Sequence, residues 1–206
     1  MQGFTLLIKS IVEVAPTKLQ ESIDVLKANL FDVGNAHALE LGLKGKLNGE
    51  PAEYLAFVKK KAASIEADMC FGAIFGGGTE NEIKALSQYG RILGILTTLR
   101  EEFIDVFEIE ELAQKMNIDR LPIPMIFAMQ DPKTKKEIEK ILLKKRIAKK
   151  DLETIIDTVF EAESVKKLKK EMEDFAAQAI YVLRILQGKE LCKQLELWVS
   201  SMLEDL

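Results

Sequence analysis

The hydrophobic residues of this chain recur three and four positions apart along most of its length, which is the spacing of helices that bury one face. No segment of the sequence shows the alternation of apolar and polar residues that marks a half-buried strand. The clearest helical register runs from Lys18 to Leu47 and contains Leu19, Ile23, Leu26, Leu30, Val33, His37 and Leu41. The pattern therefore predicts an all-α fold.

Glycine, proline and capping residues divide the rest of the chain into further helices. Gly76–Gly78 should end one helix, and Thr79 with Glu82 three residues later forms a capping-box signature for the next. Two prolines predict an extended crossing over Arg120–Pro124, because proline is not tolerated in a helix interior. The further helices expected are residues 3–14, Glu53–Phe75, 80–107, Met125–Met129 closed by Asp131-Pro132, Glu137–Lys145, Lys149–Phe160, Ser164–Leu186 and Glu190–Leu203. We expect about nine helices in a single domain over residues 1–206.

The expected helix of residues 80–107 has two different faces. One face is apolar and suited to packing, with Ile92, Ile95, Leu96, Leu99, Phe103 and Val106. The opposite face is a narrow stripe that leads from small or hydroxylated residues to carboxylates: Ser87, Gly90, Gly94, Thr97, Thr98, Glu101 and Asp105. At 100° per residue, Asp105 lies within about 40° of Glu101. We expect this stripe to line a cavity.

Glu101, Glu102 and Asp105 are the first candidate site. A carboxylate pattern of this kind usually marks a solvated helix face. The small-residue stripe beside it favours a cavity instead, and carboxylates four residues apart on a helix can share a hard cation. Mg²⁺ prefers such oxygen ligands and keeps waters that diphosphate oxygens can replace. The residues alone therefore give a hypothesis of a Mg²⁺ site.

Composition and charge narrow the function classes. With 48% hydrophobic and 30% charged residues, the 206-residue chain is long enough to form one core without a metal or a disulfide. Its net charge of −4 argues against nucleic acid as the main partner, which requires a concentrated basic face. The lysine runs of residues 133–150 and 166–170 interleave with acidic residues, which predicts a solvated face. No segment reaches the roughly 20 apolar residues that span a bilayer, so we expect no stable membrane insertion.

The cysteines and the histidine limit the chemistry further. Cys70 and Cys192 match no paired or metal-ligand spacing, so we interpret them as reduced thiols of a cytoplasmic protein. The presence of one histidine, His37, argues against a zinc site of the usual kind. Because His37 falls on the apolar face of its helix, we expect it in the core or at the edge of a cavity.

Four segments occur in the order found in one enzyme family: residues 54–63 (YLAFVKKKAA), 90–94 (GRILG), 100–106 (REEFIDV) and 120–128 (RLPIPMIFA). With them the chain resembles the trans-isoprenyl diphosphate synthases, the polyprenyl synthetase family, in its archaeal-like branch. The resemblance implies an isoprenoid-synthase-type helical bundle around a central cavity, where two facing aspartate-rich motifs hold Mg²⁺ and an allylic diphosphate. It runs over nearly the whole chain but covers only the last two-thirds of the family's length.

The resemblance also implies roles for individual residues. Glu101-Glu102-x-x-Asp105 falls at the family's second aspartate-rich motif, which makes these three residues the expected metal ligands. Lys61 matches the helix lysine that holds the allylic diphosphate, and Arg120 matches the lysine before the family's Thr-Leu-Pro segment. Both are expected to be catalytic, because cationic side chains stabilise the charge that develops on the leaving diphosphate. The substrate-binding residues expected are Asn35, at the family's Gly-Gln position, with Lys61, Thr97, Thr98 and Arg120.

The chain departs from the family at several of these positions. Glu101 and Glu102 replace an aspartate pair, Ala62 replaces the threonine after the helix lysine, and Pro122 replaces the threonine of the Thr-Leu-Pro segment. The first aspartate-rich motif and the arginine pair that follows it have no counterpart in this sequence. The chain therefore resembles a family member without its N-terminal third.

The leading functional hypothesis is an isoprenyl diphosphate synthase that condenses isopentenyl diphosphate with an allylic diphosphate, as a truncated chain. We expect it to work as a homodimer or with a catalytic partner subunit. Two alternatives belong to other classes. One is a non-catalytic regulatory or structural subunit of a hetero-oligomeric prenyl synthase, motivated by the missing motif. The other is a helical protein that binds an isoprenoid.

Overall fold

A computed structural model describes residues 18–46, 49–108, 112–113, 120–144, 146–204 and 206. All the regular secondary structure in these ranges is helical, as the hydrophobic spacing predicts. The elements are α2 (Leu19–Leu43), α3 (Pro51–Lys61), α4 (Ala63–Phe75), α5 (Glu80–Phe107), α7 (Ile123–Ala128), α8 (Pro132–Leu142), α9 (Lys149–Glu161), α10 (Glu163–Val182), the 3₁₀ helix η2 (Leu183–Ile185) and α11 (Lys189–Ser201). The helix expected at residues 3–14 lies outside the described residues.

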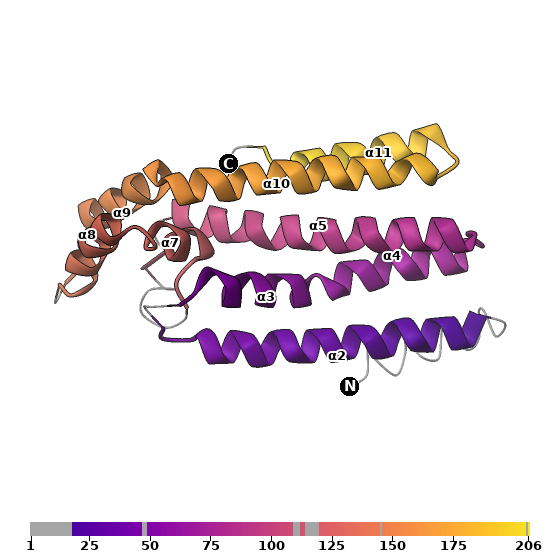
Figure 1. The fold of residues 1–206 in the computed structure, drawn as a ribbon, viewed down its shortest axis with the longest axis horizontal. Coiled ribbons are helices and arrows are strands. Elements are labelled where there is room, and N and C mark those ends of the chain that lie inside the picture. Colours follow the sequence, from indigo (N-terminus) through magenta and orange to yellow (C-terminus); the bar gives the residue numbers. More distant parts are fainter. Residues whose placement is uncertain (1–17, 47–48, 109–111, 114–119, 145, 205) are drawn as a thin grey trace.

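The helices form an elongated bundle with α5 along its middle (Figure 1). α10 runs beside one side of α5, while α3 and α4 follow one another along another side. α2 packs on α3 and α4, away from α5, and α11 returns along α10. The short helices α7, α8 and α9 gather at the end of the bundle where α5 finishes, so this end brings together segments distant in sequence.

The apolar face of α5 forms the centre of the core, as its spacing predicts. Leu93, Leu96 and Phe103 are fully buried there, in one hydrophobic cluster with residues from α3, α7, α9 and α10. The members from those helices include Phe57, Val58, Ile123, Met125, Ile155, Val159, Val165 and Met172. Burying one such side chain contributes about 1.5–3 kcal/mol relative to leaving it exposed. α5 is therefore held on several sides, and residues along it have fixed positions.

The start of α5 confirms the capping signature. The Thr79 N–H donates to Glu82 Oε2 (2.8 Å) and the Glu82 N–H donates to Thr79 Oγ1 (3.3 Å), which satisfies two backbone donors of the first turn. The preceding glycines end α4, with Gly77 at φ +75° and the Gly78 N–H donating to the Ala73 carbonyl (2.9 Å). A left-handed residue at the end of a helix is a common stop, and glycine adopts it without steric cost.

Several helix boundaries differ from the prediction: α7 begins at Ile123 and includes Pro124 in its first turn, so the extended crossing expected over Arg120–Pro124 is shorter, and two further differences have a clear physical cause. The expected helix Glu53–Phe75 is two helices interrupted at Ala62, where α5 packs closely: a Cβ placed on Gly94 would lie 2.8 Å from Ala62 Cα. The second difference concerns Asp131, which was expected to close a helix and instead caps one. Its side chain accepts from the Lys133 and Thr134 N–H groups, so α8 begins at Pro132, in the first turn where proline is tolerated.

The expectation for His37 is wrong. Its side chain is 73% exposed and lies 3.7 Å from Glu40. The buried residues of α2 are Ser22, Leu26, Ala36 and Leu43, whereas Leu30 and Leu41 of the predicted face are exposed. The face that packs on α3 and α4 is therefore rotated from the one that apolar spacing indicated, and His37 falls outside it.

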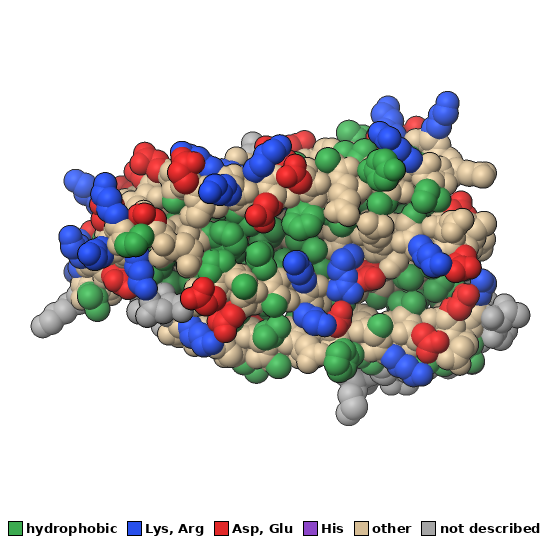
Figure 2. Space-filling model, viewed as in Figure 1, with side chains coloured by type: hydrophobic (Ala, Val, Ile, Leu, Met, Phe, Trp, Pro, Cys, Tyr) green, Lys and Arg blue, Asp and Glu red, His purple; other side chains and the backbone are tan. Residues whose placement is uncertain are grey.

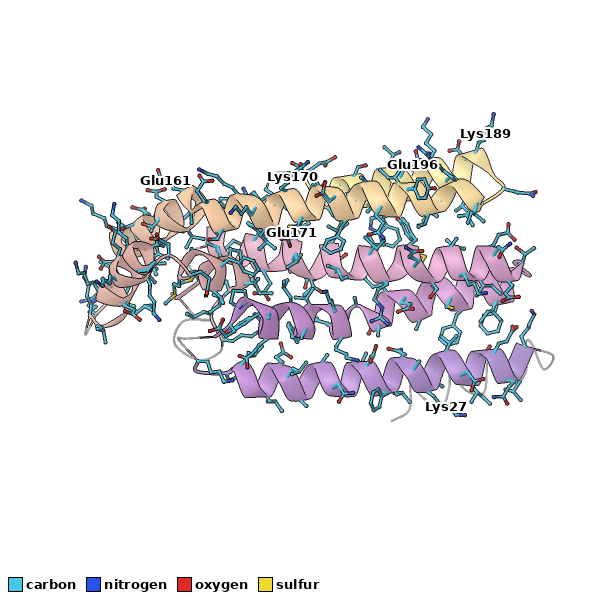
Figure 3. All side chains as sticks on the ribbon, in the orientation of Figure 1. Lys27, Glu161, Lys170, Glu171, Lys189 and Glu196 are labelled. Carbon is cyan, nitrogen blue, oxygen red and sulfur yellow. The ribbon has the colours of Figure 1, made fainter. Side chains whose placement is uncertain are left out.

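The lysine-rich helices carry a solvated face, as predicted. Lys166 lies 2.8 Å from Glu163 and Lys170 lies 2.9 Å from Glu173, both as exposed pairs within one helix. The labelled side chains of Glu161, Lys170 and Lys189 point away from the bundle (Figure 3). Charges of both signs are interspersed over the visible face, with hydrophobic side chains between them (Figure 2). Among the described helices, none is long and apolar enough to cross a membrane.

Candidate functional site

The candidate site lies along the second half of α5, between the end of α3 near the middle of the bundle and the segment before α7 at the end of the bundle (Figure 1). The last turns of α5 carry Glu101, Glu102 and Asp105. Lys61 is the last residue of α3, and Arg120 precedes α7 by three residues. The structure thus brings the charged residues singled out in the sequence into one region, and their pairings decide what each can do.

Glu102 and Arg120 form a buried ion pair with each other. Arg120 Nη1 donates to Glu102 Oε2 at 2.8 Å, and Arg120 Nη2 donates to Glu102 Oε1. Both side chains are only 4% exposed. The two parallel hydrogen bonds match the planar guanidinium to the carboxylate, which is the strongest geometry for such a pair. Removing one partner of a buried pair costs about 3–5 kcal/mol, because the other charge stays buried without compensation.

Further contacts surround this pair. The Ile123 N–H, at the start of α7, donates to Glu102 Oε2 at 3.1 Å. The Arg120 guanidinium lies over the Phe57 ring, 4.9 Å from its centroid, and Arg120 Nε is 3.8 Å from Glu40 Oε1. Residues of α2, α3, α5 and the start of α7 therefore meet at one buried charge cluster.

Tyr54 lies near this cluster and is fully buried. Its hydroxyl has no hydrogen-bond partner among the residues that the structure describes. Burial raises the pKa of Tyr54, and the charge of Glu102 raises it too, while the charge of Arg120 works in the opposite direction. Gly49 lies against the ring edge, where a Cβ would come within 2.3 Å of Tyr54 Cε2, so this position has no room for a side chain.

Lys61 and Glu101 form a much looser pair. Their charged atoms are 3.8 Å apart, and the side chains are 46% and 60% exposed. Lys61 Nζ also lies 5.7 Å from the centroid of the Phe57 ring. An exposed pair of this kind contributes about 0.2–1 kcal/mol, so a phosphate group can compete with Glu101 for the lysine at little cost.

The three carboxylates do not face the one common site that the sequence predicts. Glu102 points into the buried pair, whereas Glu101 is exposed and Asp105 is half-buried. Within the described ranges, no group of three or more His, Cys, Asp or Glu side chains is arranged to hold a metal ion. Glu102 therefore lies apart from Glu101 and Asp105, and the metal-binding role of these residues stays a prediction. Two carboxylates are a number that Mg²⁺ accepts when substrate phosphates supply further ligands, so these two residues fit that ion.

At Gly90 and Gly94 the small-residue stripe of α5 packs closely against other backbone, so the prediction that these residues line a cavity is wrong, whereas Ser87 lies at a small pocket of about 130 Å³ between α2, α4 and α5. A Cβ on Gly90 would lie 2.8 Å from the Ile65 carbonyl oxygen, and one on Gly94 would lie 2.8 Å from Ala62 Cα. Ser87 Oγ donates to Glu66 Oε1 at 2.8 Å across the same contact. Small residues allow the α5 and α4 backbones to approach closely, which explains the stripe without a ligand.

The remaining substrate-binding candidates, Thr97, Thr98 and Asn35, each make a hydrogen bond within the fold. Thr98 is buried and donates to the Gly94 carbonyl within α5 (2.9 Å), and Thr97 Oγ1 lies 3.5 Å from Met202 Sδ. Asn35 donates to the Phe31 carbonyl within α2 (2.8 Å). Asn35 also lines an open groove of about 690 Å³ between α2 and α3, where Lys60 is another lining residue.

A second charged network was not found from the sequence. Asp32 accepts from Lys60 Nζ (2.6 Å) and Arg91 Nη2 (3.3 Å), and Arg91 also pairs with Glu66. Burial acts to raise the pKa of Asp32, but the hydrogen bonds and charges of Lys60 and then Arg91 outweigh it and lower the pKa. Asp32 and Arg91 are 59 residues apart, and single charges at that separation give no periodic signal. The network ties α2 to α3, α4 and α5.

Comparison with known proteins gives a family match and several relatives. The sequence model of the family described as polyprenyl synthetase matches residues 1–159. The short chain isoprenyl diphosphate synthase of Methanothermobacter thermautotrophicus is 34% identical over 94 residues, which are 45% of this chain and 29% of that protein. The heterodimeric geranylgeranyl pyrophosphate synthase large subunit 1, chloroplastic, of Arabidopsis thaliana is 35% identical over 91 residues, which are 41% of this chain and 24% of that protein.

A solved structure extends the likeness to the fold. The geranylgeranyl pyrophosphate synthetase of Pyrococcus horikoshii superposes with a TM-score of 0.79 at 23% identity, over 93% of this chain and 60% of that one. The chain thus spans less than a third of the length of these two curated relatives in the matched segments, and about three-fifths of the solved structure. The bundle described above is the all-α isoprenoid synthase fold. Because the family match covers more than half of its residues, this chain belongs to the polyprenyl synthetase family.

Proposed function

We propose that this chain acts in prenyl chain elongation, as an isoprenyl diphosphate synthase that joins isopentenyl diphosphate to an allylic diphosphate. The observation that carries the proposal is the family match over residues 1–159, which includes the segments of Lys61, Glu101 and Arg120. The relatives named as isoprenyl and geranylgeranyl diphosphate synthases support the same chemistry. The cytoplasm is the compartment we propose, in keeping with the free thiols of Cys70 and Cys192.

Lys61 is the residue we propose for the diphosphate group of the allylic substrate. It ends α3, its side chain is half exposed, and its ion pair with Glu101 is long. A lysine ammonium placed beside a leaving diphosphate stabilises the negative charge that develops as the allylic carbon–oxygen bond breaks. The anchored Phe57 ring beneath Lys61 limits where the ammonium can lie.

Glu101 and Asp105 are the residues that would hold Mg²⁺, since they lie one helical turn apart on the same stripe of α5. When bound, the ion would supply charge neutralisation for the diphosphate. Asn35, in the groove between α2 and α3, is the residue we propose as a further substrate contact, with Lys60 as a second cation beside it. Thr97 and Thr98 stay candidates for the substrate, with their hydroxyls bonded to Met202 and the Gly94 carbonyl in this structure.

The test is incorporation of labelled isopentenyl diphosphate into longer allylic products by the full-length product of the locus that encodes this chain. We expect incorporation that requires Mg²⁺ and stops on chelation with EDTA. Absence of incorporation, both by this protein alone and in combination with a catalytic family member, would exclude the proposal. Binding of a prenyl ligand with equal affinity in Mg²⁺ and EDTA would instead indicate a protein that only binds isoprenoids.

A second candidate function is that of a subunit that stabilises or regulates a catalytic partner. The observation that favours it is the pairing of Glu102 with Arg120, because each occupies a position expected to bind metal or diphosphate. The relative that is the large subunit of a heterodimeric synthase supports unequal pairs as an arrangement in this family. Co-purification with a family member that carries two aspartate-rich motifs, and a changed rate or product length on mixing, would support this role over a homodimer that works alone.

A further inference from the structure

We propose that Glu102 and Arg120 are positioning residues that fix the start of α7 and α3 onto α5, and that neither binds the metal or the diphosphate. Their structural role stands on the contacts alone. The claim about ligands rests on the proposed function, since it concerns which residues of this chain the diphosphate meets.

The first step concerns Glu102. Its side chain is 4% exposed, while that of the adjacent Glu101 is 60% exposed. One Glu102 oxygen accepts from Arg120 Nη2, and the other accepts from Arg120 Nη1 and the Ile123 N–H. To coordinate a cation, this carboxylate would have to leave three donors and a buried position. Glu101 needs to leave only a loose contact with Lys61.

The second step concerns Arg120. Its guanidinium is held by Glu102, lies on the Phe57 ring and has Glu40 at 3.8 Å from Nε. A diphosphate that took this guanidinium would leave the Glu102 carboxylate buried beside an anion. Charges buried in that way are strongly unfavourable. The pair is therefore satisfied internally, and Lys61 is the nearby cation that a ligand meets at the surface.

The third step concerns what the pair holds in place. Arg120 and Ile123 flank Leu121-Pro122, and Pro122 has no N–H to donate. The Arg120 side chain and the Ile123 N–H both bond Glu102, so the segment that enters α7 is attached to α5 at two points. The same guanidinium packs on Phe57, and that ring also lies beneath Lys61. The pair therefore holds the segment before α7 and the Phe57 ring in place without touching a ligand.

The experiment compares Glu102→Gln with Glu101→Gln in the full chain, using inorganic pyrophosphate with Mg²⁺ as the probe. Thermal unfolding and isothermal titration calorimetry are the two measurements. We expect Glu102→Gln to lower Tm by about 10 °C, because Arg120 stays buried without its anion, and to leave the pyrophosphate Kd within about threefold. Glu101→Gln should leave Tm within about 2 °C. A Glu102→Gln variant with unchanged Tm and more than tenfold weaker binding would overturn the proposal.

A second measurement needs no variant and applies even where Glu102→Gln fails to fold. The Arg120 Nε resonance of the wild-type chain should keep its chemical shift as pyrophosphate and Mg²⁺ are added, while the Lys61 side-chain resonance moves. A shift of Arg120 Nε that saturates with the ligand would contradict the proposal. The charge-reversed double variant Glu102→Arg with Arg120→Glu should recover part of the Tm lost by either single variant. If the wild-type chain binds no pyrophosphate, the proposed function fails, while the Tm comparison still decides the positioning role.

Discussion

The close approach of the α5 backbone to the α3–α4 junction limits the size of the side chain at single positions of α5. At Gly94 the contact is with Ala62 itself, whose Cα, Cβ and carbonyl oxygen all lie within 2.9 Å of the position that a Cβ on residue 94 would take. Gly34, in the exposed part of α2, has nothing within 4 Å of such a position. Both glycines are helical, so they share the entropic cost of glycine in a helix and differ only in the space around them.

Gly94→Ala should therefore destabilise the fold, whereas Gly34→Ala should stabilise it. We expect a loss of about 1–3 kcal/mol for Gly94→Ala, because the added methyl group meets backbone atoms that cannot move aside cheaply. Gly34→Ala should gain about 0.5–1 kcal/mol from helix propensity. Urea denaturation with a constant m value measures both. Equal effects of the two substitutions would show that the close contact at Gly94 is absent.

Asp32 makes a pH-dependent contribution to stability. Its folded pKa is lowered, by the hydrogen bonds and charges of Lys60 and Arg91 against the opposing effect of burial, from an ordinary value of 3.8. A carboxyl with a lowered folded pKa stabilises the folded state above its unfolded pKa, and this stabilisation is lost as pH falls through the folded pKa. The contribution is therefore complete at neutral pH, begins to fall near pH 4 and is lost as pH falls further through the lowered folded pKa.

Asp32→Asn should cost about 1–2 kcal/mol of unfolding free energy at pH 7, because two hydrogen bonds to charged donors lose their ionised acceptor. The difference between this variant and the wild-type chain should shrink as pH falls from 5 to below 3.8. Denaturation curves at several pH values measure it. A difference that stays constant down to pH 3 would mean that the ion pairs of Asp32 contribute nothing.

At the scale of elements, the N-terminus of α5 could be predicted from the sequence, whereas the helices that pack around α5 could not. Its capping box is local in sequence, so Thr79 and Glu82 could be recognised from their spacing alone. Its burial on several sides depends on how α4, α7 and α10 pack against it, which no local sequence signal shows. The cap therefore offers a test of one element that does not disturb the core.

Thr79→Ala should reduce stability by about 1 kcal/mol, since the Glu82 N–H loses its acceptor in the first turn of α5. Thr154→Ala is the matched control, because Thr154 is an exposed threonine within α9 whose hydroxyl bonds to its own helix. Alanine has the higher helix propensity, so the control should be neutral or slightly stabilising. Thermal unfolding of the two variants separates loss of the cap from loss of a hydroxyl.

For the whole molecule, periodicity predicted the all-α fold and the position of most helices, because helix formation and helix ends leave local signals. Periodicity failed to predict which face of a helix is buried where that depends on the helix packed against it. His37 and Leu41 lie on an apolar stripe of α2 but are exposed, since α3 and α4 pack on an adjacent face. Gly90 and Gly94 suit both a cavity wall and a close helix contact, and only the position of α4 distinguishes the two.

For the candidate site, the sequence predicted which residues take part but not how they pair. Sequence resemblance located Lys61, Glu101 and Arg120, and the fold places them along the second half of α5. It did not show that Glu102 and Arg120 would pair with each other, because two opposite charges 18 residues apart carry no sign of burial. Fewer residues of the site therefore face the surface than the sequence motif contains, because Glu102 and Arg120 are buried while Lys61 and Glu101 are exposed.

The most direct test of this account compares Lys61→Ala with Lys59→Ala in the Mg²⁺-dependent incorporation of isopentenyl diphosphate. Lys59 is a neighbouring exposed lysine of α3, so the control removes the same charge from the same helix. We predict that Lys61→Ala lowers kcat/KM for the allylic diphosphate about 100-fold, equivalent to about 2.7 kcal/mol of lost transition-state stabilisation, and that Lys59→Ala changes it less than threefold. Equal rates for the two variants would contradict the placement of the diphosphate at Lys61.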